Sequence, residues 1–233
     1  MLMVEKIVHD HRPVTLVGGG KATPEDLYEA LTLAPTCVAA DGGAALAALA
    51  EVSLAAVIGD FDSIPGALLA ELPEGKRHRI AEQSSTDFEK ALSRIAAPLV
   101  IGVGFTGGRI DHQLAAFHSL MRFAAQPCAL LAETEVIFLA PPVLRLPTEP
   151  GDVISLFPLA PVTGRSDGLV WPIAGLEFAP GAQIGTSNRA TGPLTLEIDA
   201  AAMLVIVSRS LLGAVVAELS GASDPRWSGG GAV

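Results

Sequence analysis

The feature that most constrains this chain is a pattern repeated through its first 140 residues: a short, wholly apolar run ends in glycine or aspartate, and a helix-like stretch follows. It begins with "PVTLVGGG" (13–20) and "TPEDLYEAL" (23–31), where a Thr N-cap, a proline at the first helical position and first-turn acids predict a helix. Strands that are apolar throughout and separated by helices form parallel sheets covered on both faces. The pattern therefore predicts an α/β domain over residues 1–140.

Four polar motifs follow predicted strands of this domain: "GGGK" (18–21), "DGG" (41–43), "GDFDS" (59–63) and "FTGGRIDH" (105–112). In a parallel sheet the carboxyl ends of the strands lie at one edge, and ligands bind in the crevice there. We therefore expect the four motifs to line one site. Helices are expected between the strands, at 44–51, 64–72, 85–96 and 109–125.

From about residue 141 the pattern changes. Short apolar or alternating runs are separated by Pro, Gly, Asn and Asp, with almost no helical periodicity. This predicts a small all-β sandwich domain over residues 141–219. The last segment, 220–233, is polar and Gly-rich, and we expect it to be a flexible tail.

Composition and charge exclude several classes of function. The formal net charge is −10 and Lys and Arg form no cluster, which argues against a nucleic-acid surface. No apolar stretch approaches the ~20 residues that cross a bilayer, and the N-terminal segment does not resemble a secretion signal. We therefore expect a cytoplasmic protein without membrane contact. Cys37 and Cys128 stand in apolar surroundings with no nearby ligand partner, which indicates reduced core residues.

Asp60 and Asp62 place two carboxylates at one predicted strand end. Placing two negative charges together costs free energy unless a cation or a proton neutralises one of them. Mg²⁺, which carboxylates and substrate phosphates bind together, is the obvious cation. A local alternative is that Asp60 caps the turn while Asp62 caps a helix starting near Ile64. Asp41 is equally open, since it either lines the crevice or serves as an ordinary N-cap.

The glycines of "GGGK" lack the spacing of a P-loop or of a dinucleotide-binding turn. A tight turn that needs positive φ explains them at least as well as a phosphate site. In "EQSSTDFEKAL" (82–92), Thr86 and Glu89 fit a capping box, and Asp87 is favoured by the helix dipole.

Arg109, Asp111 and His112 are harder to explain locally, because they combine a cation, an acid and a titratable base at a strand-to-helix junction. Acidic strand ends with few basic residues apart from Lys21 and Arg109 predict a metal-bridged polyphosphate substrate. The residues alone thus indicate Mg²⁺-dependent phosphoryl or nucleotidyl chemistry in an α/β crevice, with no acceptor named.

In order along the chain, "DGG", "GDFDSI", "EQSSTDFEKAL", "GFTGGRIDHQLA" and "GLVWPI" with "GTSN" resemble the thiamine pyrophosphokinase family. The resemblance spans about residues 15–209. It implies a homodimer whose subunits pair an α/β catalytic domain with a thiamine-binding β-sandwich domain. The implied activity is that of an ATP:thiamine diphosphotransferase, which transfers a pyrophosphoryl group from ATP to the hydroxyethyl group of thiamine and gives thiamine diphosphate and AMP.

The resemblance also implies roles for particular residues. Asp60, Asp62 and Asp87 are implied to bind Mg²⁺ and the ATP phosphates. These three residues, with Arg109 and Asp111, form the implied catalytic set. The further residues implied to contact ATP are Asp41, Gln83, Thr86, Arg109 and His112. The base that removes the hydroxyl proton of thiamine is either Asp87 or Asp111.

In the second domain, Trp171 resembles the aromatic residue that stacks on the thiamine ring, and Ser187 with Asn188 matches a Ser-Asn pair that contacts the substrate. In the implied homodimer, the partner subunit is one possible source of these thiamine-binding residues. Taken without the family, Trp171 is better explained as a core residue of the sandwich and "TSN" as a hairpin turn.

Two rival functions stay open. One is another Mg²⁺-dependent phosphotransferase or phosphohydrolase on the same crevice. The other is a non-catalytic ligand-binding relative, whose expected sign would be a missing carboxylate or a missing Arg; neither is missing from the motifs.

Overall fold

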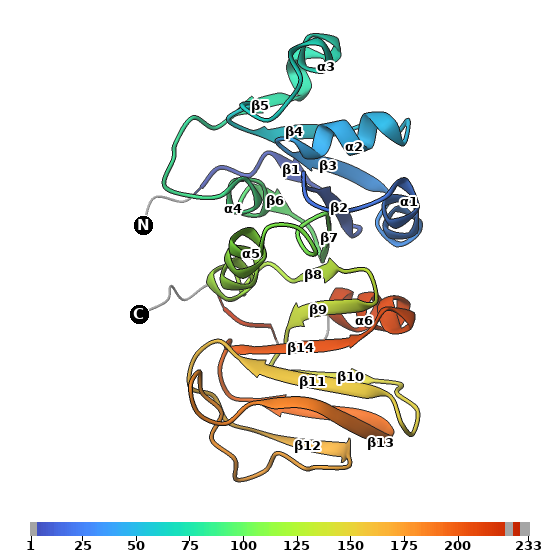
Figure 1. Cartoon of the computed structure of the whole chain (residues 1–233), viewed down its shortest axis with the longest axis vertical. Coiled ribbons are helices and arrows are strands. Elements are labelled where there is room, and N and C mark those ends of the chain that lie inside the picture. Colours follow the sequence, from blue (N-terminus) through green and yellow to red (C-terminus); the bar gives the residue numbers. More distant parts are fainter. Residues whose placement is uncertain (1–3, 222–225, 229–233) are drawn as a thin grey trace. The chain divides into compact units, whose positions relative to one another are not determined.

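The apolar runs of the first half form short parallel strands in the computed structural model, which describes residues 4–221 and 226–228 (Figure 1). Strand β2 (Val14–Val17) pairs in parallel with β7 (Val100–Val103). Strand β4 (Ala56–Gly59) pairs in parallel with β3 (Thr36–Ala40) on one side and β5 (Arg77–Arg79) on the other. Every residue of β2, β4 and β7 is buried, as expected for strands covered on both faces.

Helices follow most of these strands, as the sequence predicts. They are α1 (Pro24–Leu33), α2 (Gly43–Leu49), α3 (Gly66–Glu71), the short 3₁₀ turn η1 (Glu74–Lys76), α4 (Asp87–Leu92) and α5 (Ile110–Arg122). The remaining elements of the chain up to residue 133 are β1 (Val8–His9), β6 (Ile95–Ala96) and β8 (Cys128–Leu131).

The two faces of the parallel strands are covered by different helices. On one face, Val17, Ala39 and Val57 from three strands form a single buried cluster with Leu27 of α1 and Ala44 of α2. Helix α4 packs on β3 and β4, and its buried residues lie outside that cluster, so it covers the opposite face. Cys37 and Cys128 are both buried with free thiols, in agreement with the prediction.

Both predicted N-terminal caps are present. Thr23 and Asp26 form a capping box at α1, and Thr86 and Glu89 form one at α4. Helix α4 ends at Leu92, four residues before the predicted end. The reason is that its last predicted residues form β6 and pair in parallel with β1.

The second half of the chain folds mainly into strands, as predicted, and these strands pair antiparallel. It ends in a helix over residues 212–220, an element that the predicted all-β domain does not include. The strands are β9 (Glu135–Leu139), β10 (Val143–Leu146), β11 (Val153–Pro158), β12 (Gly164–Leu169), β13 (Gly185–Ile198) and β14 (Met203–Ser208), followed by η2 (Arg209–Leu211) and α6 (Leu212–Ser220). The long strand β13 pairs with β11 through its first part and with both β10 and β12 through its second part. Inward residues such as Ile154, Leu156, Leu194 and Leu196 alternate with exposed ones and form the core.

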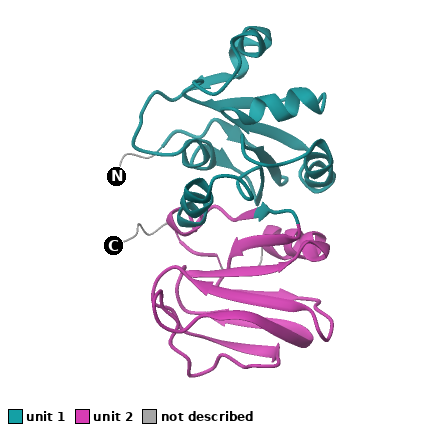
Figure 2. Cartoon of the chain, in the orientation of Figure 1, with its two compact units in different colours: residues 1–119, 130–133 teal, residues 120–129, 134–233 magenta. Residues whose placement is uncertain are grey.

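The chain divides into two compact units, residues 1–119 with 130–133 and residues 120–129 with 134–233 (Figure 2). The domain boundary expected at residue 140 stays a prediction. Most of the expected tail, 222–225 and 229–233, lies outside the described residues. Within the described part of the tail, the indole N–H of Trp227 donates a 2.8 Å hydrogen bond to the Ala140 carbonyl. Among the described residues, no helix combines the length and the apolar character needed to cross a membrane.

Candidate active site

The carboxyl ends of β2, β3, β4 and β7 open into one pocket of the first unit, as the positions of the four motifs predict. The residues predicted for the site that line this pocket are Asp41, Asp60, Asp62, Gln83, Thr86, Asp87, Arg109 and His112. Asp111 is not among the lining residues. The pocket therefore brings together eight predicted residues from the turns after β3, β4 and β7, from the segment that leads into α4, and from the first turns of α4 and α5.

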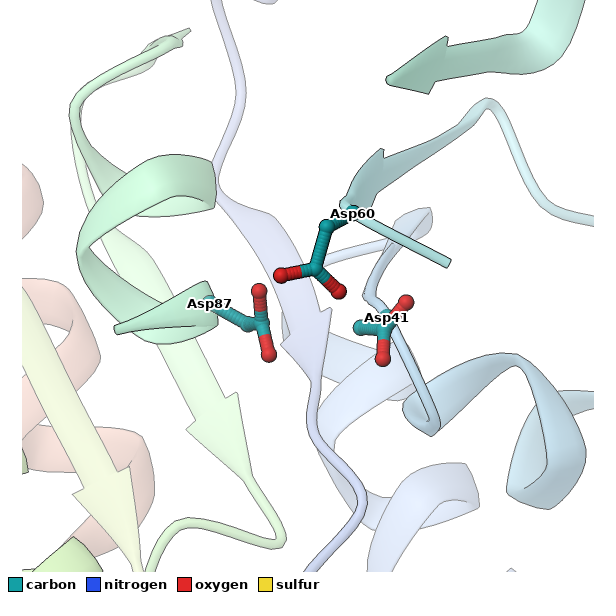
Figure 3. Close-up of side chains that lie close together, drawn as sticks. All are labelled: Asp41, Asp60 and Asp87. Atoms are coloured by element: carbon teal, nitrogen blue, oxygen red, sulfur yellow. The ribbon is translucent and has the colours of Figure 1, made fainter. Parts of the chain in front are cut away.

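Three of these aspartates form the acidic cluster of the site. Asp41 follows β3, Asp60 follows β4 and Asp87 begins α4, and each offers a carboxylate oxygen within 4.8 Å of the other two (Figure 3). Asp41 is almost fully buried, and Asp60 and Asp87 are half-buried. The predicted metal set contains Asp62 in place of Asp41. Asp62 lies at the exposed rim, so its role as a ligand stays a prediction.

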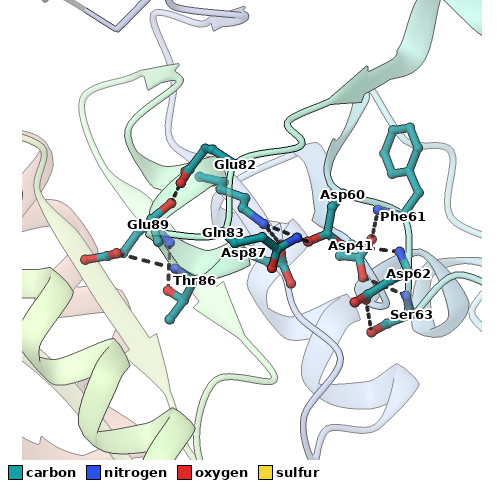
Figure 4. Close-up of polar contacts among 12 residues, drawn as sticks. Asp41, Asp60, Phe61, Asp62, Ser63, Glu82, Gln83, Thr86, Asp87 and Glu89 are labelled. Atoms are coloured by element: carbon teal, nitrogen blue, oxygen red, sulfur yellow. Dashed lines mark hydrogen bonds and ion pairs between the residues drawn. The ribbon is translucent and has the colours of Figure 1, made fainter.

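Asp41 also joins the turns at the ends of two neighbouring strands. Its Oδ1 accepts the Phe61 backbone N–H at 2.8 Å and its Oδ2 accepts the Ser63 backbone N–H at 3.0 Å (Figure 4). The alternative of an ordinary N-cap is wrong, because the N-cap of α2 is Gly42 and that cap makes no side-chain hydrogen bond. Asp41 therefore fixes the turn that carries Asp60.

The local explanation of Asp62 is also wrong. Helix α3 begins at Gly66 after the N-cap Pro65, and no side chain caps it. The Asp62 carboxylate instead accepts a 2.8 Å hydrogen bond from the Ser63 hydroxyl. Asp62 is thus free of any helix-capping role and keeps its place at the pocket.

Lys90 is the residue of this site that sequence analysis missed. Its side chain is buried, with the whole residue only 2% exposed, and its Nζ lies 2.9 Å from Asp60 Oδ2 and 3.0 Å from Asp87 Oδ1. A lysine in a helix is usually an exposed residue, so its type alone carries no signal. Its spacing does, since it stands three residues after Asp87 on the same helical face.

The charges of this group influence one another. Burial by itself lowers the pKa of Lys90, but the hydrogen bonds to Asp60 and Asp87 outweigh it and raise that pKa. The hydrogen bond from Lys90 lowers the pKa of Asp60. Burial raises the pKa of Asp87, and this outweighs the opposite effect of Lys90.

The donors of the cluster fit a hard divalent cation. Carboxylate oxygens are the side-chain ligands that Mg²⁺ prefers, and here three converge from three elements. With Lys90 protonated and the aspartates ionised, the group carries two uncompensated negative charges, which one divalent ion balances. Asp60 and Asp87 belong both to this cluster and to the predicted metal set.

The glycines of "GGGK" are explained by close packing of two turns. A Cβ on Gly20 would lie 2.5 Å from the Gly104 carbonyl oxygen, and a Cβ on Gly18 would lie 2.9 Å from the same oxygen. Neither glycine has positive φ, so positive φ does not explain them and the tight-turn alternative is wrong in its reason. In the turn after β7, Gly104 and Gly107 do have positive φ, at +78° and +70°. The turns after β2 and β7 therefore touch backbone to backbone and form one wall of the pocket.

The remaining predicted residues of this unit lie around the pocket rim. Gln83 donates a 3.2 Å hydrogen bond to Asp60, and the Thr86 hydroxyl is engaged in the cap of α4. Arg109 pairs with Asp111 at 2.6 Å, and both side chains are mostly exposed. The exposed guanidinium is therefore available to a ligand at the cost of one exposed ion pair.

In the second unit, Trp171 and Asn188 hold each other. The Asn188 side chain accepts from the Trp171 backbone N–H at 3.2 Å and donates to the Trp171 carbonyl at 2.7 Å. Asn188 is only 5% exposed, whereas Trp171 is 59% exposed. The alternative of a core tryptophan is therefore wrong. The amide of Asn188 is used to position the backbone that presents the indole.

Ser187 lies inside β13, so the alternative of a hairpin turn is wrong as well. Its φ is +62°, and its backbone N–H donates a 2.9 Å hydrogen bond to the Ser155 hydroxyl of β11. The register between the two strands shifts at this point. Ser187 thus occupies a β-bulge, a local irregularity that re-aims side chains.

Residues 27–132 match the family model described as thiamin pyrophosphokinase, catalytic domain. Among solved structures, the chain is similar to thiamin pyrophosphokinase from Geobacillus thermodenitrificans, with 22% identity, a TM-score of 0.70, and coverage of 84% of this chain and 97% of that chain. It is similar to thiamin pyrophosphokinase from Candida albicans, with 16% identity, a TM-score of 0.71, and coverage of 88% and 93%.

A protein from Lactobacillus plantarum is also similar, with 25% identity, a TM-score of 0.70, and coverage of 85% of this chain and 99% of that chain. No curated protein matches the chain. At these identities the structural likeness shows a shared fold, and it extends over both units.

Proposed function

We propose that this chain, which belongs through its residues 27–132 to the thiamin pyrophosphokinase family of enzymes, transfers a pyrophosphoryl group from ATP to thiamine and releases AMP. The observation that carries the proposal is the convergence of Asp41, Asp60, Asp87 and Lys90 at the strand ends, all inside the matched segment. Such a cluster suits a metal-bound polyphosphate, and the family match supplies the reaction.

Mg²⁺ is the cofactor that fits, held by Asp60 and Asp87 with Asp41 or Asp62 as the third carboxylate. When bound, it supplies charge neutralisation and Lewis-acid activation at the phosphates of ATP. The chain's own residues then orient the substrates. Arg109 turns from Asp111 to the phosphates, and His112 and Gln83 line the same pocket beside them.

In the proposed reaction the hydroxyl oxygen of thiamine attacks the β-phosphorus of ATP in line. A new oxygen–phosphorus bond forms, the bond from the β-phosphorus to the oxygen of AMP breaks, and the hydroxyl proton passes to a base. Of the two candidate bases, Asp87 lines the pocket and Asp111 does not.

The second unit is proposed to bind thiamine through Trp171, whose backbone Asn188 holds, and through Ser187, which precedes Asn188 in β13. An exposed indole offers an aromatic face for stacking on a ring that carries positive charge.

We also propose that the chain is a homodimer. Support comes from a group of large apolar side chains exposed on the second unit: Val153, Phe157, Val170, Trp171, Leu176 and Ile184. A second copy of the chain would bury part of this group. Light scattering coupled to size exclusion, at several protein concentrations, tests it; a monomer at every concentration contradicts it.

The decisive experiment is a product assay with ATP, Mg²⁺ and thiamine. We expect AMP and thiamine diphosphate in equal amounts, and Asp60→Asn as the control without turnover. ADP with thiamine monophosphate, or free phosphate alone, would support the rival phosphotransferase or phosphohydrolase. Binding of both ligands without any product would support a non-catalytic relative.

A further inference from the structure

Lys90 combines two properties that rarely occur together in a lysine. It is buried, and its ammonium group lies between two carboxylates of the acidic cluster, 2.9 Å from Asp60 and 3.0 Å from Asp87. Its helix begins with the Thr86 capping box, which sets the direction of the first turn. Lys90 is therefore held in place by the fold and is not a solvated lysine that folded over the site.

The position of Lys90 affects the charge that a metal ion meets. Without Lys90, three carboxylates with oxygens within 4.8 Å of one another would present three negative charges to any divalent cation. With Lys90, one of these charges is already balanced, and the ammonium itself occupies the space between Asp60 and Asp87. A free cation is thus attracted less strongly, and it must compete with a bound ammonium for the carboxylates of Asp60 and Asp87.

The phosphates of a nucleotide change this balance, because they bring several negative charges and additional oxygen ligands into the pocket. Lys90 is then able to keep its contacts or to donate to a phosphate oxygen, as ammonium groups do in other phosphate sites.

Resting on the proposed function for its nucleotide, we propose that Lys90 is a built-in counter-ion of the cluster. It holds Asp60 and Asp87 together in the metal-free protein, and it makes binding of the divalent cation depend on the nucleotide's phosphates. Lys90 is in this sense a positioning residue. Its effect appears in metal binding before any turnover.

The test compares Mn²⁺ binding, measured by titration calorimetry and by Mn²⁺ electron paramagnetic resonance, with and without a non-hydrolysable ATP analogue. In the wild-type protein we expect weak binding of Mn²⁺ alone and much tighter binding with the analogue. Lys90→Met, which keeps the length and apolar stem of the side chain, should tighten binding of Mn²⁺ alone by about tenfold or more. Lys76→Met, in η1 and outside the pocket lining, is the charge-matched control and should behave as wild type.

Thermal unfolding supplies a second readout. Loss of Lys90 leaves two carboxylates close together without their counter-ion, so the variant should melt at a lower temperature in EDTA and regain most of the difference in Mn²⁺. If Lys90→Met folds only when Mn²⁺ is present, that supports the proposal; failure to fold in Mn²⁺ as well overturns it.

Two other results overturn the proposal. One is wild-type protein that binds Mn²⁺ equally well with and without the analogue. The other is a Lys90→Met variant whose affinity for Mn²⁺ alone equals that of wild type. None of these measurements uses thiamine or turnover, so the proposal stands or falls separately from the identity of the acceptor.

Discussion

Asp41 and Gly59 lie so close together, at the ends of the neighbouring strands β3 and β4, that a Cβ added to Gly59 would stand 2.7 Å from the Cβ of Asp41. This approach is what lets the Asp41 carboxylate reach past the end of β4 and accept the backbone N–H groups of Phe61 and Ser63. The "GDFDS" turn is therefore positioned by a carboxylate from the neighbouring strand end, and Asp60 takes its place in the cluster as a consequence.

Gly59→Ala should destabilise the protein because the added methyl group meets both the Cβ and a carboxylate oxygen of Asp41. We expect a loss of about 1–3 kcal/mol in the free energy of unfolding, measured by urea denaturation. Gly66→Ala is the matched control, since a Cβ there meets nothing within 4 Å and the residue begins α3. That control should be neutral or slightly stabilising. Equal stability of the two variants would contradict the role of the close approach.

Asp62→Asn tests whether the metal set includes the exposed aspartate of the turn. Because Asp62 is exposed, the substitution should change the free energy of unfolding by no more than about 0.5 kcal/mol. If Asp62 is a ligand, turnover falls by about a hundredfold and the Mg²⁺ concentration needed for half-maximal rate rises. Steady-state rates across a Mg²⁺ series measure both.

Near-normal turnover of Asp62→Asn at saturating Mg²⁺ would remove Asp62 from the metal set and leave Asp41, Asp60 and Asp87 as its members. Asp60→Asn is the reference for a residue of the cluster. It should lose activity and also stability, because it weakens the ion pair with buried Lys90.

The strands, their parallel pairing and the pocket at their ends could be predicted from the sequence, because apolar runs and the residues that end them are local features. The role of Asp41 could not, since an aspartate after a strand and before a helix fits an N-cap equally well. Only the hydrogen bonds from the Phe61 and Ser63 backbone to the Asp41 carboxylate, which join the turns after β3 and β4, distinguish the two roles. Lys90 was missed for a similar reason. Its burial depends on α4 packing against β4, and the one signal within the helix, its position three residues after Asp87, does not by itself distinguish it from an exposed lysine.

In the second unit the family resemblance pointed to Trp171, Ser187 and Asn188, whereas the residues alone favoured ordinary structural roles. A tryptophan in an apolar run is usually a core residue. In the structure the Trp171 indole is exposed, because the Trp171 backbone is hydrogen-bonded to Asn188 of β13. Asn188 lies at an irregularity in the pairing of β13 with β11, and no local sequence pattern predicts that irregularity.

Glu82 gives the protein a predictable response to acid. Hydroxyl groups of Ser84 and Ser85 donate to its carboxylate and lower the pKa of Glu82 from a usual 4.5 to about 2. Between these values the unfolded chain binds more protons at this residue than the folded chain does. The stabilising contribution of Glu82 is therefore full above the unfolded pKa and is lost as pH falls through the folded pKa.

Urea midpoints of wild type and Glu82→Gln, measured between about pH 7 and pH 3, test this. The difference in stability should be largest above the unfolded pKa and should narrow as pH falls. Glu74→Gln, an exposed carboxylate of η1, controls for the loss of one negative charge. A difference between wild type and Glu82→Gln that is independent of pH would refute the assignment.

Trp171→Ala should separate the two substrates of the proposed reaction. The indole is mostly exposed, so its removal should leave the melting temperature nearly unchanged, and the backbone hydrogen bonds to Asn188 survive the substitution. If the indole stacks on thiamine, the loss is about 1–2 kcal/mol of binding, which raises the KM for thiamine by about tenfold and changes the KM for ATP little. Asn188→Ala is the companion variant, because it releases the Trp171 backbone while keeping the indole. It should raise the same KM and also lower stability, since it leaves the partly buried Trp171 carbonyl without the Asn188 donor. A larger rise in the KM for ATP than for thiamine in Trp171→Ala would remove the indole from the acceptor site.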